Sequence, residues 1–237
     1  MKIKFLFITI VFLYATTTLA QSGGINFTLA FPQGEFKENV DRLGYGGSLQ
    51  VLFFNPTPDF PASFGINLGY INYGSESRRE PFSYTIPDVF VDVDRTNNLV
   101  NFHLLFQLIS PTGTFRPYVE GLFGGSYIFT ETSINSRNYD EVASSTNFDD
   151  FAWNYGAGGG FFILLSDEME GELSSLFLDL KVRYLFGSEA EYLKEGSVIL
   201  GDNGRVAYQV SKSKTDLLTV NLGVVAYFSG IFWPQEN

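Results

Sequence analysis

Large apolar side chains alternate with small or polar side chains along most of the chain after residue 23. In the clearest segment, 174–186, every even position from 176 to 186 holds Leu, Val, Tyr or Phe, and Asp179, Lys181 and Arg183 lie between them. A period of two residues indicates a β-strand whose two faces differ in polarity. The same period predicts eight strands, at residues 24–31, 44–54, 62–73, 98–109, 115–129, 151–165, 174–186 and 216–228.

The connections between these segments alternate in length. The long ones cover 32–43, 74–95, 130–149 and 187–215, whereas the intervening links at 55–61, 110–114 and 166–173 are short. This alternation is typical of outer-membrane barrels, which have long extracellular loops and short periplasmic turns. An even number of strands places the N-terminal and C-terminal ends of the barrel chain on the periplasmic side.

Within the longest connection, residues 198–200 and 205–210 flank a Gly-Asp-Asn-Gly turn, which predicts a small hairpin. Its arms are too short to cross a bilayer, because a crossing strand needs about 9–11 residues. We therefore predict an all-β chain that forms an eight-stranded antiparallel up-and-down transmembrane β-barrel. A ten-stranded barrel is the alternative.

The alternation alone also fits a soluble lipocalin-like barrel, whose apolar face points inward. Three features favour an outward apolar face. That face carries large residues at nearly every position, and an eight-stranded interior has little room for them. The opposite face is rich in Gly, Asn and Ser, which suits a narrow polar lumen. Aromatic residues near the strand ends resemble the interfacial girdles of membrane barrels: Phe31, Phe53, Tyr70, Tyr127, Trp153, Tyr184 and Phe228.

The first twenty residues have the pattern of a secretory signal peptide. Lys2 and Lys4 precede an apolar run over 5–14, and Ala20 offers a small residue for cleavage. The run is shorter than the roughly 20 residues of a membrane-spanning helix, which makes an uncleaved anchor the less favoured alternative. We predict a signal peptide at 1–20, a single barrel domain at 21–237, and a location in the outer membrane of a Gram-negative cell envelope.

Composition narrows the chemistry. The chain has no Cys and one His, His103, which excludes thiolate and multi-histidine metal sites, so no metal or cofactor is predicted. The net charge of −11 argues against a nucleic-acid partner. A lipid deacylase needs His, Ser and an acid together. In the predicted strand His103 points inward among polar neighbours, so a non-enzymatic protein is expected and a lipid-modifying enzyme is the weaker alternative.

Charged and polar residues concentrate on the predicted lumen face of three strands. Charges inside a narrow barrel must pair to offset the cost of desolvation. We expect an ion-pair plug that closes the lumen, and a narrow pore is the alternative. The predicted lumen cluster consists of His103, Gln107, Arg116, Glu120, Asp179, Lys181 and Arg183.

Two motifs resemble the strands of small OmpA/OmpX-type barrels and of the broad outer membrane protein beta-barrel domain family. They are Arg-Pro-Tyr-Val-Glu-Gly at 116–121 and Trp-Asn-Tyr-Gly-Ala-Gly-Gly-Gly at 153–160. The resemblance covers most of 21–228. It implies eight strands in the outer membrane, with lipid and the barrel insertion machinery as partners. Many such barrels end on an aromatic residue, whereas here nine residues, 229–237, follow Phe228.

These features predict a surface protein that presents acidic and aromatic loops for binding or for envelope integrity. An extracellular ligand or protein would contact aromatic loop residues. The alternatives are a narrow channel or a secretion or assembly accessory barrel, and a soluble periplasmic lipocalin-like ligand binder. The aromatic loop residues are Tyr84, Phe90, Tyr139, Phe148, Tyr192 and Tyr208.

Overall fold

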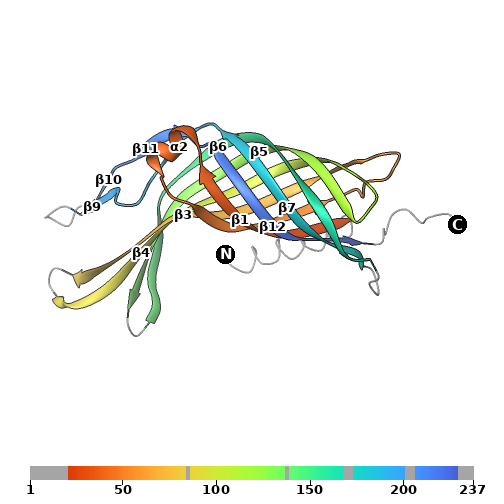
Figure 1. Cartoon of the computed structure of the whole chain (residues 1–237). Helices are drawn as coiled ribbons and strands as arrows, with labels where there is room; N and C mark the ends of the chain where they lie inside the picture. The colour runs from red at the N-terminus through yellow and green to blue at the C-terminus, as the bar shows by residue number, and fades with distance from the viewer. Residues whose placement is uncertain (1–20, 84–85, 137–138, 168–172, 201–205, 229–237) are drawn as a thin grey trace.

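The computed structural model describes residues 21–83, 86–136, 139–167, 173–200 and 206–228. The predicted signal peptide at 1–20 and the tail at 229–237 lie outside these residues. Eight strands close into one barrel in the order β1-β12-β7-β6-β5-β4-β3-β2 (Figure 1). They are β1 (Ser22–Pro32), β2 (Gly44–Leu52), β3 (Ala62–Ser83), β4 (Ile86–Ile109), β5 (Phe115–Ser136), β6 (Tyr139–Ser166), β7 (Leu173–Gly187) and β12 (Leu217–Phe228).

Every strand of the barrel pairs antiparallel with both neighbours, and β1 pairs with β12 to close the sheet, with Ile25 opposite Val224. This confirms the eight-stranded up-and-down barrel. The predicted small hairpin exists as β9 (Val198–Leu200) and β10 (Val206–Tyr208). It forms a separate two-stranded sheet, so the ten-stranded alternative is wrong.

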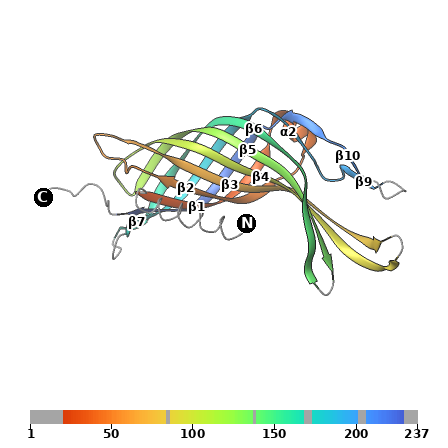
Figure 2. The same ribbon diagram turned by 180° about the vertical axis from the view of Figure 1, so that it is seen from behind.

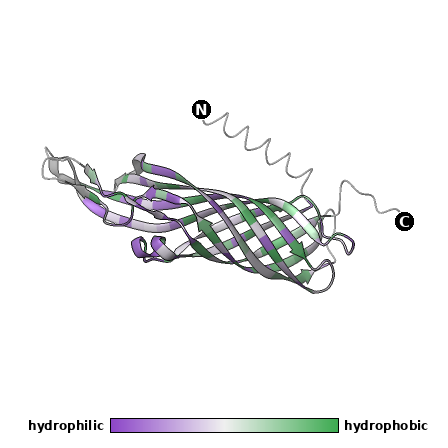
Figure 3. Ribbon diagram, turned by 90° about the horizontal axis from the view of Figure 1, so that it is seen from above, coloured by the Kyte–Doolittle hydropathy of each residue, from purple (hydrophilic) through white to green (hydrophobic). Residues whose placement is uncertain are grey.

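The apolar face points outward. On β4, Leu104 and Phe106 are 43% and 46% exposed, whereas Leu105 between them is fully buried. Figure 3 shows the resulting alternation of hydrophobic and hydrophilic residues along the barrel strands. An outward apolar face with a polar interior is the arrangement of a transmembrane barrel and the reverse of a soluble one. The lipocalin-like alternative is therefore wrong.

Four strands run far beyond the barrel wall. The residues predicted as loops at 74–95 and 130–149 continue β3–β4 and β5–β6 as long hairpins, with Ser77 opposite Asp94 and Thr132 opposite Ser145. We call them the β3–β4 arm and the β5–β6 arm. Within the first loop the sequence also suggests that 88–94 extend the fourth strand beyond the membrane, and β4 confirms this extension. Pairing between β4 and β5 reaches only Asp92 and Asn135. The two arms project from the end of the barrel opposite the short turns (Figures 1 and 2).

Three further elements lie at the same end of the barrel: helix α2 (Gly34–Asn39), β8 (Glu189–Tyr192) and β11 (Ser211–Lys214), which pairs with β8. The sequence analysis does not predict α2. Gly34 begins it with a φ of +53°, a conformation that glycine adopts most readily. In the described part of the chain, no helix has the length and apolar character that crossing a membrane requires.

Candidate functional site

The centre of the lumen holds a buried pair between Arg183 on β7 and Glu120 on β5. The Arg183 Nε lies 2.5 Å from Glu120 Oε1, and Nη2 lies 3.2 Å from Oε2. Gln107 donates a hydrogen bond of 2.8 Å to Glu120 Oε2, and Arg183 Nη1 donates one of 3.1 Å to Asn67 Oδ1. The carboxylate and the guanidinium thus have several partners each, which is what a buried ion pair needs to offset desolvation.

A second buried pair lies beside the first. The Lys181 ammonium is 2.7 Å from Asp179 Oδ2 and donates a hydrogen bond of 2.6 Å to Gln50 Oε1. The Tyr118 hydroxyl donates to Asp179 Oδ1 at 2.6 Å. We call Glu120, Asp179, Lys181 and Arg183 the ion layer. None of these four residues is more than 4% exposed.

Glycines on β6 make room for the ion layer. Arg183 lies opposite Gly158, and Lys181 lies opposite Gly160. A Cβ at Gly158 would meet Arg183 Cγ at 2.9 Å and Glu120 Oε1 at 3.2 Å. Because β6 presents no side chain here, Glu120 on β5 and Arg183 on β7 meet across it. The glycine run that sits within a strand therefore has a packing role in the lumen.

His103 lies in a polar layer next to the ion layer. Its Nε2 is 2.7 Å from Asn154 Oδ1, and the Asn154 amide in turn contacts the Ser126 hydroxyl. The His103 side chain is 1% exposed, so neither a lipid nor a soluble substrate reaches it. The adjacent cavity of about 20 Å³, lined by His103, Asn101 and Ser48 among others, has room for about one water molecule.

Arg116 is not part of the ion layer. It lies at the short-turn end of the barrel, with its guanidinium 4.5 Å from the ring centroid of Phe177 and 5.9 Å from that of Tyr227. Its Nε donates to the carbonyl of Gly113 at 3.1 Å. The sequence places Arg116 correctly on the inward face, but it is the second residue of β5. An inward residue that near a strand end lies at the mouth of the barrel and not among the central charges.

Aromatic packing closes both ends of the barrel. At the short-turn end, the buried cluster includes Tyr118, Phe162, Phe177 and Tyr227. The alternation of the strands already places Tyr118 and Phe177 on the inward face, but the sequence analysis does not foresee that inward aromatic residues pack together at this end. The inward phase of 162 and 227 within their predicted strands is the signal that would have completed the cluster.

At the other end, Phe36 from α2 packs edge-on against Tyr73 and Tyr192, at centroid distances of 5.8 and 5.1 Å. We call these three residues the extracellular cap. The Tyr73 hydroxyl donates to the Leu193 carbonyl at 3.2 Å, and the Tyr192 hydroxyl is 2.6 Å from Ser213 Oγ. Burial raises the pKa of the Tyr192 hydroxyl above its usual value. Of the predicted loop aromatics, Tyr192 is thus buried in the cap, whereas Phe90 and Tyr208 are exposed.

The described residues contain no candidate metal site. No group of three or more His, Asp or Glu side chains among the described residues is arranged to hold a metal ion. The lumen is a polar interior between two aromatic closures, in which the charged groups are paired but buried atoms such as His103 Nδ1 and Gln107 Oε1 have no hydrogen-bond partner among the residues that the structure describes.

No family model and no curated protein sequence matches this chain. Solved structures with some likeness include Neisserial surface protein A, with 11% identity, a TM-score of 0.44, and coverage of 87% of this chain and 96% of that one. A major outer membrane protein from Thermus thermophilus has 12% identity and a TM-score of 0.38, with coverage of 88% of this chain and 99% of that one. Ail from Yersinia pestis, solved with the heparin analogue sucrose octasulfate, has 14% identity and a TM-score of 0.29, with coverage of 88% of this chain and 96% of that one.

These likenesses assign no role to any residue. The identification of the fold rests on this chain's own strand pairing and on the direction of its apolar face. A closed sheet of eight antiparallel strands, lipid-facing Leu and Phe side chains, and a lumen filled with paired charges occur together in one class of protein. The chain therefore forms a small eight-stranded antiparallel β-barrel with the polarity of an outer-membrane barrel.

Proposed function

We propose that this protein is a non-enzymatic surface protein whose two arms bind an extracellular partner, while the barrel serves as a closed membrane anchor. The observation that carries the proposal is the contrast between a lumen closed at three levels and two long hairpins that stand clear of the barrel. A lumen whose internal cavity has room for about one water molecule is poorly suited to transport. The arms, in contrast, present exposed side chains on a rigid support.

The composition of the arms narrows the kind of partner. Residues 74–95 and 130–149 together contain nine acidic and four basic residues, a net charge of −5. Complementary charge accelerates association and suppresses unsuitable partners. On the β3–β4 arm the Arg79 guanidinium lies 5.3 Å from the ring centroid of Phe90, which is 46% exposed. A neutral or basic protein surface with apolar contacts fits the arms better than a polyanion does.

The test removes the arms and keeps the barrel. Ser77 and Asp94 are register partners, as are Thr132 and Ser145, so an Asn-Gly turn joins each pair after deletion of 78–93 and 133–144. Cells that display the full-length protein or the armless variant are compared for adhesion to neighbouring cells and to surfaces coated with basic or acidic protein. We expect the armless variant to keep its heat-modifiable gel migration and to lose adhesion.

Conductance across planar bilayers separates this proposal from the channel alternative. The full-length protein is expected to show no single-channel steps. Unchanged adhesion after removal of both arms, together with regular conductance steps, would contradict the proposal and assign the protein to transport.

A further inference from the structure

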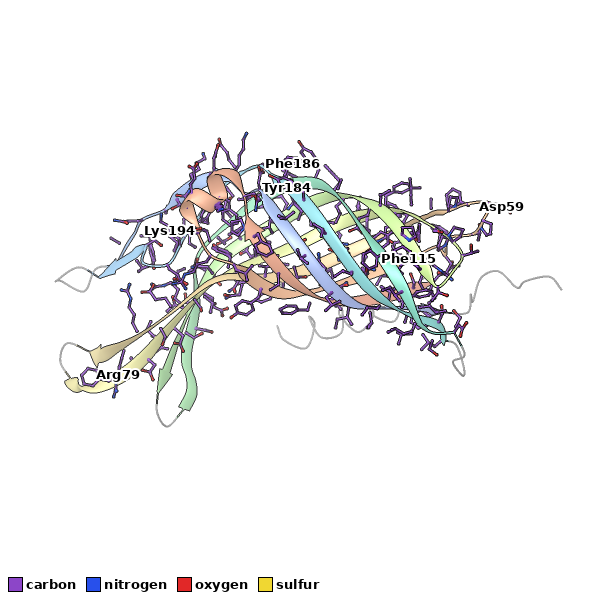
Figure 4. The ribbon with its side chains drawn as sticks, viewed as in Figure 1. Asp59, Arg79, Phe115, Tyr184, Phe186 and Lys194 are labelled. Carbon is purple, nitrogen blue, oxygen red and sulfur yellow. The ribbon has the colours of Figure 1, made fainter. Side chains whose placement is uncertain are left out.

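The first residue of the predicted mature chain takes part in the closure of the barrel. The sequence predicts cleavage of the signal peptide after Ala20, which makes Gln21 the N-terminal residue. Gln21 directly precedes β1 and is hydrogen-bonded to Asn55, in the connection between β2 and β3. Figure 4 labels Asp59 of the same connection at the end of the barrel opposite the arms. The terminus that cleavage creates is therefore held in the sheet at the short-turn end.

Two polar atoms of Gln21 bond to one segment of the chain, 52–55. The Gln21 main-chain nitrogen donates to the Leu52 carbonyl at 2.9 Å, and the side-chain oxygen Oε1 accepts a hydrogen bond of 2.5 Å from the Asn55 amide. On the side of β12, the Gln21 carbonyl accepts from the Phe228 amide at 2.9 Å. The one remaining polar atom, the side-chain nitrogen Nε2, makes no hydrogen bond to any residue that the structure describes.

Cleavage changes the chemistry of the Gln21 nitrogen. In the uncleaved chain this nitrogen is a planar amide N–H, the donor that a sheet requires. After cleavage it is an α-amino group, which is charged when protonated and nucleophilic when not. The amino group and the side-chain amide carbon Cδ belong to the same residue, so the nucleophile and its target are already held together.

We propose that Gln21 is a modification site, at which the new N-terminus cyclises to pyroglutamate. The α-amino nitrogen attacks Cδ of its own side chain, so that the Nα–Cδ bond forms and the Cδ–Nε2 bond breaks. Nε2 leaves as ammonia and takes a proton from the amine. The reaction is intramolecular and needs no oxidant, reductant or second substrate.

The hydrogen bonds of Gln21 match the product of this reaction. The lactam keeps one N–H and the oxygen Oε1, which are the two groups that bond to 52–55, and it loses the nitrogen that has no partner there. The lactam nitrogen is again a neutral planar amide, so it restores the donor for the Leu52 carbonyl that cleavage removes. The site lies at the end of the barrel opposite the arms, so its failure would leave the proposed function untouched.

Mass spectrometry of the N-terminal tryptic peptide tests the proposal. The protein is purified from the outer membrane of the cells that produce it, and trypsin releases residues 21–37. A synthetic peptide of the same sequence, with an open N-terminus and a heavy-isotope label, is added before digestion and reports cyclisation during handling. We expect the native peptide to be lighter than its open form by the mass of one ammonia, while the labelled peptide stays mostly open.

Hydrogen exchange tests the bond made by Oε1. Gln21→Ala removes this oxygen, and the Asn55 amide should exchange about fivefold faster, which is the effect of one hydrogen bond. Gln21→Glu is the matched control, because it keeps an oxygen acceptor at the same distance along the side chain, and it should exchange close to the native rate. Heat-modifiable migration checks that both variants fold.

An open Gln21 terminus in the native peptide would overturn the proposal. Equal cyclisation of the native and labelled peptides would also overturn it, because the lactam would then form during handling. A native chain that begins at any other residue would overturn both the modification and the predicted cleavage site. Unchanged exchange of the Asn55 amide in Gln21→Ala would remove the structural basis of the proposal.

Discussion

The ion layer and the extracellular cap close the same barrel by different means. The ion layer takes its four residues from β5 and β7, and the register of these strands with β6 between them determines which charges meet across the wall. The cap joins Phe36, Tyr73 and Tyr192, which come from a helix and two strands far apart in the sequence. Closure by charge is thus a property of the barrel sheet, whereas closure by aromatic packing depends on the connections above it.

The two closures also fail differently. Loss of one charge in the ion layer leaves its partner buried without compensation, which costs more than the interaction itself is worth. Loss of a ring from the cap removes apolar contact but leaves no buried charge. The barrel should therefore be sensitive to single substitutions in its centre and tolerant of them in its cap.

The largest expected effect is that of Glu120→Ala. This change leaves the Arg183 guanidinium buried without its carboxylate, and it should lower the free energy of unfolding by about 3–5 kcal/mol. Urea unfolding in lipid vesicles, followed by heat-modifiable gel migration, measures it. The double variant Glu120→Met, Arg183→Met removes both charges and should recover most of the loss. If the two single effects simply add in the double variant, the pair is not coupled and the account of the ion layer is wrong.

A charged side chain on the lipid-facing side of β7 tests whether the barrel accepts charges only in its polar lumen. Leu180 neighbours Lys181 in sequence but faces the lipid, so Leu180→Arg should cost about 2–4 kcal/mol near the midplane and impair insertion into the bilayer. Leu180→Met keeps an apolar side chain on the lipid face and should insert as the native protein does. The folded fraction after dilution into vesicles compares the two variants. Equal insertion of both variants would contradict the outward direction of Leu180.

The cap should respond locally. Phe36→Ala removes a fully buried ring from the extracellular end, and hydrogen exchange of 188–200 and 206–216 should accelerate there. The free energy of unfolding of the barrel should change by less than about 1 kcal/mol, because the strands keep all of their pairing. A large change in the unfolding midpoint would mean that the cap and the sheet fold as one unit.

The smallest effect is expected at the short-turn mouth. Arg116→Gln removes the guanidinium from the rings of Phe177 and Tyr227 and should cost about 0.5–1 kcal/mol, measured by the same urea unfolding. Arg116→Lys keeps the charge and should cost less. A loss as large as that of Glu120→Ala would show that Arg116 belongs energetically to the ion layer after all.

The sequence predicts the barrel well because a period of two is a local property. The position of each strand in the wall and the face of each residue follow from it, as for Leu104 and Leu105. The lengths of β3 to β6 do not follow, since the residues beyond Tyr73 and before Asn98 are mostly polar and become strands only through pairing with each other.

The contacts within the ion layer and the cap cannot be predicted from the alternation of polar and apolar residues. Alternation is enough to place Asp179, Lys181 and Arg183 on one face, but the pairing of Arg183 with Glu120 depends on the register of β5, β6 and β7. Helix α2 has six residues, too few for an amphipathic period to be visible. Its Phe36 therefore gives no sign in the sequence that it meets Tyr192.

The arms have a consequence for the distance at which this protein works. Strand β3 continues eleven residues past Asn72, where its pairing with β2 ends. At about 3.3 Å per residue, the arm reaches roughly 35 Å along its own direction. That length is comparable to the roughly 30 Å hydrocarbon core that the barrel crosses. Because the arms lean away from the barrel axis (Figure 1), this length carries their tips to the side of the barrel mouth as well as outward from it, so a partner bound there is held away from the barrel wall.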